Sequence, residues 1–318
     1  MSVSPVDILC VGNVVVDAIG FPIDQAPPEG SLMVFDQLEM KIGGCPANTS
    51  IDLAKLGLRS GLVAKISDDG LGAFVKTQLA REGVDTRGLL VSKKKGEPTS
   101  FSFVMIPRTG NRRIMHAFGC NATFAASEID TKLFKGPQWV TFEALTLVPK
   151  LLGKNLAKLL KAARNAGART AGDTGMNTQL TNWPDAFKGC WEHFDVFFPS
   201  LEEAAMIVGS EDPRVICRYF YERGVSISGV KLGEHGCAVL TKDGYEEIPA
   251  YRVKCIDTLG AGDSFMAGLL AGLLKGKHPV EAARLGNAVA AHCVQAVGAS
   301  SGIPKLAKVE AFMRKTGK

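Results

Sequence analysis

The segment Asp257-Thr-Leu-Gly-Ala-Gly-Asp-Ser-Phe-Met-Ala-Gly268 places two glycines directly before an apolar helical stretch. Gly260 and Gly262 carry no side chains that would cover the backbone N–H groups beside them. Because a helix N-terminus presents free N–H donors and a partial positive charge, this junction predicts an anion pocket. Asp263 would lie in the first helical turn, where a carboxylate can cap the helix or accept a proton from an attacking hydroxyl. The residues of this segment leave both roles open.

Outward from this segment, short apolar stretches alternate with helical patterns along most of the chain. The strand-like stretches cover residues 6–12, 61–66, 139–142, 195–198 and 226–232. The helical patterns cover residues 46–56, 71–82, 150–165, 201–208, 263–274 and 279–297. The last two helices would close the chain. Strands that alternate with helices predict an α/β fold with a mostly parallel central sheet and helices on both faces.

Two further regions do not fit this alternation. We expect strands at residues 13–17, 32–35, 100–106 and 112–118, which would form a small second sheet over one edge of the main sheet. This lid would come from about residues 13–42 and 98–119. The apolar lid residues that we expect to be exposed, and therefore to pack against a partner, are Val14, Val16, Val34, Phe101 and Phe103. Since no repeat and no low-complexity linker divides the chain, residues 1–318 predict a single domain.

Composition excludes several classes of protein. The 318 residues are 46% hydrophobic, and their net charge of +5 is small, which excludes a disordered chain. The longest nearly uncharged apolar run is well short of the roughly 20 residues that span a bilayer, so we expect no membrane partner. The basic residues lack interleaved aromatic residues, so we expect no nucleic-acid partner. Eight scattered cysteines with no C-x-x-C pair, and no basic-then-apolar leader, predict a cytoplasmic protein with reduced thiols.

Three common kinds of site have no signature in the sequence. The five histidines show no paired ligand spacing, so we do not expect a zinc enzyme. The absence of a G-x-x-x-x-G-K-[S/T] pattern excludes a P-loop kinase. No G-x-G-x-x-G follows the first strand, so a dinucleotide-dependent dehydrogenase would lack its phosphate-binding turn.

Residues 257–263 resemble the second motif of the ribokinase-like sugar kinases (the phosphofructokinase B family), D-T-x-G-A-G-D, at every defined position. The first motif of that family is a Gly-Gly turn followed by an Asn and a helix that ends in Leu-Gly. It resembles Gly43-Gly44-Cys45-Pro46-Ala47-Asn48 through Leu56-Gly57. The two segments lie more than 200 residues apart in the family's order, and the resemblance covers essentially the whole chain. It implies a ribokinase-like three-layer sandwich with a small β-sheet lid, and a homodimer formed through the lid.

The resemblance also implies roles for single residues. Asp263 resembles the catalytic base, and Gly260, Ala261 and Gly262 resemble the anion hole. The residues that resemble the family's sugar-binding groups are Asp17, Gly43, Gly44, Asn48 and Glu143. Asp and Asn offer acceptors and donors to a polyol, and the Gly-Gly turn allows close approach of the backbone. Glu143 follows a predicted strand, and open α/β sheets bind ligands at the carboxyl ends of their strands.

A nucleotide-binding side is implied in the same way. Val230-Lys-Leu-Gly-Glu-His-Gly236 resembles the loop that contacts ATP, with Lys231 where the family often has Thr. The residues expected to bind ATP are Lys231, Gly233, Gly236 and Asn287. Asp257, together with Gly298 and Ala299, resembles the region that holds a monovalent cation such as K⁺.

One motif departs from the family. Where the family commonly has Pro-Asn-x-x-Glu, this chain has Pro199-Ser-Leu-Glu-Glu203. Glu203 keeps the acid that organises Mg²⁺ through water. Ser200 replaces the Asn, and a hydroxyl has shorter reach and fewer donors than an amide. Ser200 and Glu202 also fit the start of a helix.

Taken together, these features predict a kinase that transfers the γ-phosphoryl group of ATP, as its Mg²⁺ complex, to a hydroxyl of a sugar or sugar-like small molecule. Two alternatives remain open. The acceptor would be a nucleoside if Phe101 or Phe103 provided a slot for a purine. A sugar- or nucleotide-binding regulator without catalysis is the other alternative, although such a protein need not keep an intact base and anion hole.

Overall fold

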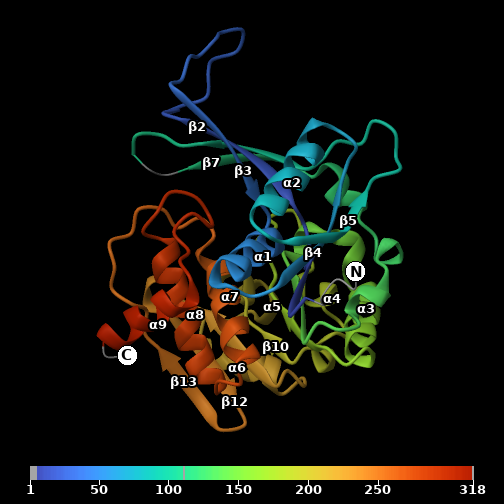
Figure 1. The fold of residues 1–318 in the computed structure, drawn as a ribbon, viewed down its shortest axis with the longest axis vertical. Helices are drawn as coiled ribbons and strands as arrows, with labels where there is room; N and C mark the ends of the chain where they lie inside the picture. The colour runs from blue at the N-terminus through green and yellow to red at the C-terminus, as the bar shows by residue number, and fades with distance from the viewer. Residues whose placement is uncertain (1–5, 110–111, 317–318) are drawn as a thin grey trace.

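The computed structural model describes residues 6–109 and 112–316, and it contains a large and a small β-sheet (Figure 1). The large sheet has nine strands in the order β13-β12-β11-β10-β9-β8-β1-β4-β5. Its strands are β1 (Ile8–Gly12), β4 (Ser60–Ile66), β5 (Asp85–Val91), β8 (Trp139–Glu143), β9 (Arg169–Gly172), β10 (Val196–Phe197), β11 (Ile227–Lys231), β12 (Cys237–Thr241) and β13 (Gly244–Ile248). All neighbours from β5 to β11 pair in parallel, and β12 and β13 add an antiparallel edge. The predicted mostly parallel sheet is confirmed.

Helices cover both faces of this sheet because its central strands are apolar on both sides. In β1, Ile8 and Cys10 belong to one buried cluster, and Leu9 and Val11 belong to the other. The first cluster is covered by α1 (Cys45–Leu56), α2 (Gly70–Arg81), α7 (Ala261–Leu274), α8 (Pro279–Cys293) and α9 (Leu306–Lys315). The second cluster is covered by α3 (Lys154–Asn165), α4 (Trp183–Ala186), α5 (Leu201–Val208) and α6 (Pro213–Tyr221). This arrangement is the expected three-layer sandwich.

Short 3₁₀ helices connect these elements. They are η1 (Gly119–Thr123), η2 (Ala126–Glu128), η3 (Thr131–Phe134), η4 (Leu145–Leu147), η5 (Pro149–Leu151), η6 (Trp191–His193) and η7 (Gly233–His235). Within residues 6–109 and 112–316, no helix has the length and apolar character needed to cross a membrane.

The small sheet is the lid, and it projects from one end of the molecule beyond α1 and α7 (Figure 1). Its order is β3-β2-β6-β7, with β2 (Val15–Phe21), β3 (Gln37–Gly43), β6 (Phe101–Met105) and β7 (Arg113–Ala117). The expected strand at residues 32–35 is wrong, because those residues lie in the loop before β3. That loop is apolar in sequence, but Leu32 and Val34 are exposed, and the ladder to β2 begins only at Gln37.

The expectation of exposed apolar side chains on the lid was correct at one position and wrong at two. Val34 is 81% exposed, whereas Val14 and Val16 are fully buried. Val14 and Val16 lie at the base of the lid, where their side chains join the core cluster between the large sheet and α1. Phe101 and Phe103 are half-buried. The apolar pattern of this segment therefore marks the attachment of the lid to the core.

The C-terminal region also differs from the sequence prediction. The helix expected to end at Val297 ends at Cys293, and α9 follows it, so three helices close the chain. Helices α7 and α8 lie close together because Gly268 of α7 packs directly on the backbone of Gly286. A Cβ at Gly268 would lie 2.8 Å from the Gly286 Cα atom. Strands β5, β9, β12 and β13 of the large sheet were not predicted either.

The topology brings many polar residues to one edge of the sheet. The carboxyl ends of β1, β8, β9, β10 and β11 meet there, together with the N-termini of α1 and α7. The lid lies at the same edge, which is where open α/β sheets bind their ligands.

Candidate active site

The start of α7 has the geometry of an anion-binding helix N-terminus. Gly260 is the N-cap residue in a left-handed conformation (φ 76°), and a Cβ there would lie 2.5 Å from the Ala299 carbonyl oxygen. The Ala261 N–H donates to the Thr258 carbonyl at 3.3 Å. The N–H groups of Gly262 and Asp263 lie in the first turn, which has no intrahelical acceptor for them. Both the αL turn and the free amides therefore depend on glycine at position 260.

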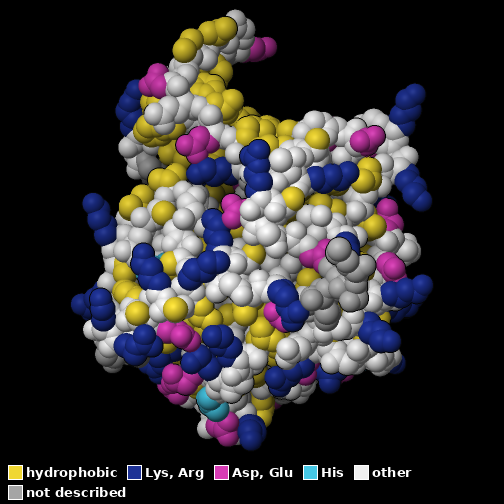
Figure 2. All heavy atoms as spheres, in the orientation of Figure 1, with side chains coloured by type: hydrophobic (Ala, Val, Ile, Leu, Met, Phe, Trp, Pro, Cys, Tyr) yellow, Lys and Arg dark blue, Asp and Glu magenta, His cyan; other side chains and the backbone are white. Residues whose placement is uncertain are grey.

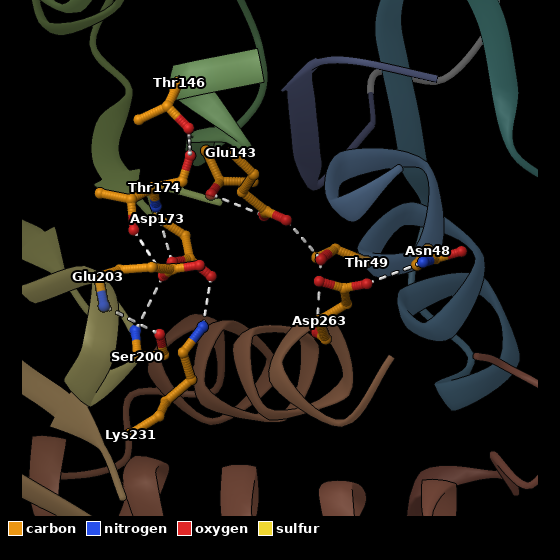
Figure 3. Close-up of polar contacts among 11 residues, drawn as sticks. Asn48, Thr49, Glu143, Thr146, Asp173, Thr174, Ser200, Glu203, Lys231 and Asp263 are labelled. Atoms are coloured by element: carbon orange, nitrogen blue, oxygen red, sulfur yellow. Dashed lines mark hydrogen bonds and ion pairs between the residues drawn. The ribbon is translucent and has the colours of Figure 1, made fainter. Parts of the chain in front are cut away.

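Asp263 lies at this N-terminus and is 8% exposed. Its Oδ2 accepts a hydrogen bond of 2.8 Å from the Asn48 amide, and its carbonyl accepts one of 3.3 Å from the Thr49 hydroxyl (Figure 3). Burial raises the pKa of Asp263 above its ordinary value, against the opposing effects of the Asn48 hydrogen bond and the Lys231 ammonium. A raised pKa makes this carboxylate a better proton acceptor, as a general base requires.

Asn48 comes from the first turns of α1, which begins at the Gly43-Gly44 turn. Gly44 is the N-cap at φ 96°, and a Cβ there would lie 2.8 Å from the Asn13 carbonyl oxygen. Asp17 of β2 lies directly over Gly43, where a Cβ would lie 2.1 Å from its Oδ2 atom. The structure therefore brings Asp17, Gly43 and Gly44 together, and the Asn48 hydrogen bond links this group to Asp263.

Glu143 is the last residue of β8, the strand next to β1, and it is fully buried. Its two oxygens accept hydrogen bonds from the hydroxyls of Thr49 (2.6 Å) and Thr141 (2.9 Å). Burial, reinforced by the nearby carboxylate of Asp263, raises the pKa of Glu143 to about 8. Its contact with a sugar stays a prediction, and in this structure its hydrogen bonds are to threonines.

A cavity of about 520 Å³ opens beside Asp263 and Gly262, and we call it the lysine cavity. Lys231, at the end of β11, extends into it and donates a 2.5 Å hydrogen bond to Asp173 Oδ2 (Figure 3). Glu203 accepts hydrogen bonds from the Thr174 hydroxyl at 2.6 Å and from the Ser200 N–H at 3.1 Å. Ser200 is thus the cap of α5, as the helix-start interpretation predicted.

Asp173 is the functional candidate that the sequence analysis missed. It directly follows β9, a strand of four residues that was not predicted. The signal was weak but present: a short apolar run, Thr170-Ala-Gly172, ends in an acid at the position where a parallel strand reaches the ligand-binding edge. Recognising β9 would have placed this carboxylate next to the other strand ends.

A second cavity, of about 510 Å³, shares Gly233, Glu234 and His235 with the lysine cavity. It is lined mainly by apolar groups of the loop after β13 and of α8, so we call it the apolar cavity. Gly236 is at φ 102°, and a Cβ there would lie 2.1 Å from the Ile248 carbonyl oxygen. Asn287 lines this cavity but donates to the carbonyls of Ile248 (3.1 Å) and Pro249 (3.4 Å), so it also holds the cavity wall in place.

The residues at these two cavities fit ATP with Mg²⁺. The apolar cavity can take a base, and the lysine cavity can take phosphates beside the α7 amides. No group of three or more His, Cys, Asp or Glu side chains within residues 6–109 and 112–316 could hold a metal ion directly. A divalent ion would therefore be held chiefly by phosphate oxygens and water, with Glu203 and Asp173 as the nearest carboxylates.

The Asp257 side chain already binds several donors in this structure. It accepts hydrogen bonds from the N–H groups of Leu259 (2.9 Å) and Gly298 (2.8 Å), and Arg112 of the lid forms an ion pair of 3.2 Å with it. Asp257 thus joins the two loops behind the anion hole. A monovalent cation at this residue stays a prediction.

Comparison with known proteins agrees with this architecture. The model of the pfkB family carbohydrate kinases matches residues 6–306. A 2-dehydro-3-deoxygluconokinase of Bacillus subtilis is 28% identical over 299 residues, which cover 89% of this chain and 90% of that protein. An uncharacterized sugar kinase of Archaeoglobus fulgidus is 31% identical over 253 residues, which cover 80% and 98%.

Solved structures share the fold at lower identity. A putative ribokinase II from E. coli in complex with ATP and Mg²⁺ has a TM-score of 0.83 at 23% identity, covering 98% of this chain and 100% of that one. The nucleoside kinase of Methanocaldococcus jannaschii, an archaeal member of the ribokinase family, has a TM-score of 0.80 at 22% identity over 98% and 100%. The fold is ribokinase-like. From its sequence, its fold and the residues at its sheet edge, the chain belongs to the pfkB family of carbohydrate kinases, which are phosphotransferases with a hydroxyl group as acceptor.

Proposed function

We propose that this protein transfers the γ-phosphoryl group of ATP to a hydroxyl of a sugar or sugar-like small molecule, with Asp263 as the general base. The observation that carries the proposal is the placement of a buried carboxylate, with a raised pKa, at the free N-terminus of α7 and at the mouth of the lysine cavity. The acceptor hydroxyl would approach from the side of Asp17 and Asn48.

In this mechanism each residue has a separate task. Asp263 accepts the proton of the attacking hydroxyl, and the first-turn amides donate to the oxygens of the transferring phosphoryl group. The Asp17 carboxylate and the side-chain amide oxygen of Asn48 hold hydroxyls of the acceptor. The buried Asn48 Oδ1 has no hydrogen-bond partner among the described residues, so it is free to accept from a ligand. Mg²⁺ bound with ATP would neutralise part of the phosphate charge.

Nucleotide and metal are supported by two kinds of observation. The apolar and lysine cavities meet at Gly233, which suits a base joined to a phosphate chain. The E. coli neighbour was solved with ATP and Mg²⁺. We propose the same pair for this chain, with Lys231, Gly233, Gly236 and Asn287 along the nucleotide.

The test of the base is Asp263→Asn, which keeps the shape of the side chain and removes the proton acceptor. Loss of a general base typically lowers a rate 10²–10⁴-fold, and we expect that loss in kcat with little change in the melting temperature. Asp243→Asn, at the exposed turn between β12 and β13, is the matched control and should keep full activity. An unchanged kcat for Asp263→Asn would show that this carboxylate is not the base.

The acceptor class is tested by a coupled assay of ADP release with sugars, sugar acids and nucleosides. We expect turnover with a sugar or a sugar acid, because the groups at the lid side of Asp263 are polar. The nucleoside alternative is favoured by one neighbour, the archaeal nucleoside kinase. Against it, Phe103 already packs on Phe35 within the lid, with ring centroids 6.2 Å apart. Turnover with nucleosides alone would replace the proposal, and release of no ADP with any acceptor would favour the regulator alternative.

We also propose a homodimer formed through the lid. Large apolar side chains of the lid lie at the surface, and Figure 2 shows this hydrophobic area on the visible face of the lid. The exposed members are Leu32, Val34, Leu38, Met40 and Met115. Exposed apolar patches of this kind commonly mark protein–protein contacts.

A further inference from the structure

The lysine cavity has an unusual charge balance for a site that would hold phosphates. Its acidic lining residues are Asp173, Glu202, Glu203, Glu234 and Asp263. Its basic lining residues are Lys231 and the exposed His235. A polyphosphate that entered this cavity would meet carboxylates at close range, and repulsion between like charges is strong where water is largely excluded. Binding of the anion therefore requires a positive charge at a defined place.

Lys231 is fixed at that place by the fold. Its N–H donates to the Pro199 carbonyl at 2.9 Å, which ties the end of β11 to the segment before α5. Its ammonium is held by Asp173 Oδ2 at 2.5 Å, and the other oxygen of Asp173 accepts the Thr174 N–H at 2.7 Å. The side chains of Lys231 and Asp173 are only 13% and 4% exposed. Hydrogen bonds therefore fix the backbone of Lys231 and the carboxylate of Asp173, so both partners of the ion pair are held in place.

The ammonium also lies over the first turn of α7. A Cβ built on Gly262 would be 3.2 Å from Lys231 Nζ, so no side chain separates the ammonium from the free amides. Burial works to lower the pKa of Lys231, but the carboxylates of Asp173 and Glu203 outweigh burial and raise it above the ordinary value. Lys231 is therefore charged at neutral pH. One fixed positive charge and the α7 amides face the same small volume.

Ser200 and Lys231 lie side by side on the wall of the lysine cavity. Ser200 and Lys231 form a parallel bridge between adjacent chain segments. Ser200 is too short to reach across the cavity, and its hydroxyl and N–H are engaged with Glu203 at the start of α5. This part of the cavity wall therefore carries one cation, the Lys231 ammonium.

From this geometry we propose that Lys231, positioned by Asp173, is a built-in counter-charge that binds the terminal phosphates of ATP beside the α7 amides, and that it lets the protein bind ATP without a divalent metal. This inference rests on the proposed kinase function and adds the role of these two residues to it. During transfer, the bond between the γ-phosphorus and the bridging oxygen breaks, and a bond from phosphorus to the acceptor oxygen forms. The acceptor proton goes to Asp263, and ADP leaves with the electron pair of the broken bond. Lys231 keeps its proton throughout and hydrogen-bonds to phosphate oxygens.

The experiment measures the affinity for ATP and for AMP by titration calorimetry, in EDTA and in excess Mg²⁺. AMP carries the base but lacks the terminal phosphates, so it serves as an internal control. We expect Lys231→Met to weaken ATP binding in EDTA by 10- to 100-fold, to weaken it less in Mg²⁺, and to leave AMP binding within twofold of the wild type. Lys242→Met, at the exposed turn after β12, is the matched control and should bind like the wild type.

Lys231→Met leaves the Asp173 carboxylate buried without its partner, which can unfold the protein. The double variant Lys231→Met/Asp173→Asn removes both charges and keeps the net charge of the cavity, and it should show the same selective loss for ATP. If either folded variant binds ATP in EDTA within twofold of the wild type, the proposal is wrong. A wild-type protein that binds neither ATP nor AMP under any condition would instead contradict the proposed kinase function.

The positioning role of Asp173 has its own readout. Asp173→Asn removes a negative charge from the cavity but leaves Lys231 without its orienting partner. We expect kcat to fall at least tenfold while the KM for ATP does not rise, a split that general destabilisation would not produce. An unchanged kcat, or a KM that rises together with the fall in kcat, would contradict this role.

Discussion

Single buried carboxyl groups dominate the physics of this site. Asp263, Glu143 and Asp52 lie within the contact between α1, α7 and the end of β8, and burial raises the pKa of each. With a pKa of about 8, Glu143 is largely protonated at neutral pH. That protonation removes one negative charge from the surroundings of Asp263, so the base can ionise at lower cost.

Asp52 has no role in the proposed chemistry, and it shows how a buried carboxyl group with a raised pKa affects the stability of the fold. It is fully buried on α1, and its Oδ2 accepts a 2.6 Å hydrogen bond from Ser264, the residue after the base. Burial raises the pKa of Asp52 to about 7, from 3.8. Between these values the folded state holds a proton that the unfolded state has lost, so this group destabilises the fold increasingly as the pH rises through the window.

We therefore predict that Asp52→Asn becomes more stable relative to the wild type as the pH rises from 4.5 to 8. The difference in the free energy of unfolding should grow by on the order of 1–3 kcal/mol over this range, at about 1.4 kcal/mol for each pKa unit. Urea unfolding at a series of pH values measures it. Asp68→Asn, at an exposed position after β4, should show a constant difference. A constant difference for Asp52→Asn would mean that the Asp52 carboxyl titrates at an ordinary pKa in the folded protein.

At the scale of elements, two helix starts form the proposed reaction centre. Both α1 and α7 begin at a glycine with a positive φ angle, Gly44 at 96° and Gly260 at 76°. These turns aim the first turns of the two helices at a common space. The hydrogen bonds Asn48–Asp263 and Ser264–Asp52 then fix the helices to each other. The anion pocket is thus a property of how α7 begins and of what it packs against.

Gly260→Ala tests this dependence. The added Cβ would lie 2.5 Å from the Ala299 carbonyl oxygen, in a backbone conformation that non-glycine residues rarely adopt. We expect unfolding to become easier by about 2–4 kcal/mol and kcat to fall, because the first turn of α7 must move.

The matched control is Gly276→Ala, in the turn between α7 and α8. Gly276 has a similar φ of 74°, but a Cβ there would meet no atom within 4 Å. The Gly276→Ala variant should lose about 1 kcal/mol of the free energy of unfolding, which is the cost of the positive φ angle alone, and it should keep full activity. Equal losses in the two variants, compared by urea unfolding and initial rates, would show that the contact with Ala299 is unimportant.

At the scale of the whole molecule, the lid has two unlike faces. The strand register places Asp17, Lys41, Ser102 and His116 in one row, directed to the same side of the lid sheet. The adjacent row on the opposite side contains Met40, Ala18, Phe103 and Met115. The lid is a mixed sheet, in which β2 and β6 pair in parallel. A sheet with an apolar row directed away from its own polar site needs a cover, and a second copy of the lid would supply one.

The prediction is that the protein is a dimer at micromolar concentration and that Met115→Lys shifts it towards the monomer. Met115 is 57% exposed and lies in the apolar row. A buried ammonium without a partner would be strongly unfavourable in such an interface. Ile114→Lys is the control, since Ile114 is 52% exposed but points to the opposite side of β7. Sedimentation velocity distinguishes the species, and a wild-type monomer, or equal effects of the two variants, would rule out this interface.

A feature of this protein could be predicted from the sequence when residues close together in the chain determine it. The helices at 201–208 and 263–274 were predicted within two residues, because their capping residues and glycines are contiguous in the chain. The parallel sheet followed from the alternation of apolar strands and helices. Strand β9 was missed because four residues carry too little periodic signal, and Val14 and Val16 were misplaced because exposure depends on what packs over them.

By itself, the sequence determined that a helix begins after Gly260 with Asp263 in its first turn, since a turn, its glycines and the first helical turn form from neighbouring residues. The anion pocket at this helix start stays a prediction. Only the tertiary structure decided which side chains complete that pocket. Lys231 and Asp173 are 58 residues apart and meet because β11 and β9 end at the same edge of a parallel sheet. The order of strands in a sheet is set by packing over the whole chain, and no local pattern encodes it.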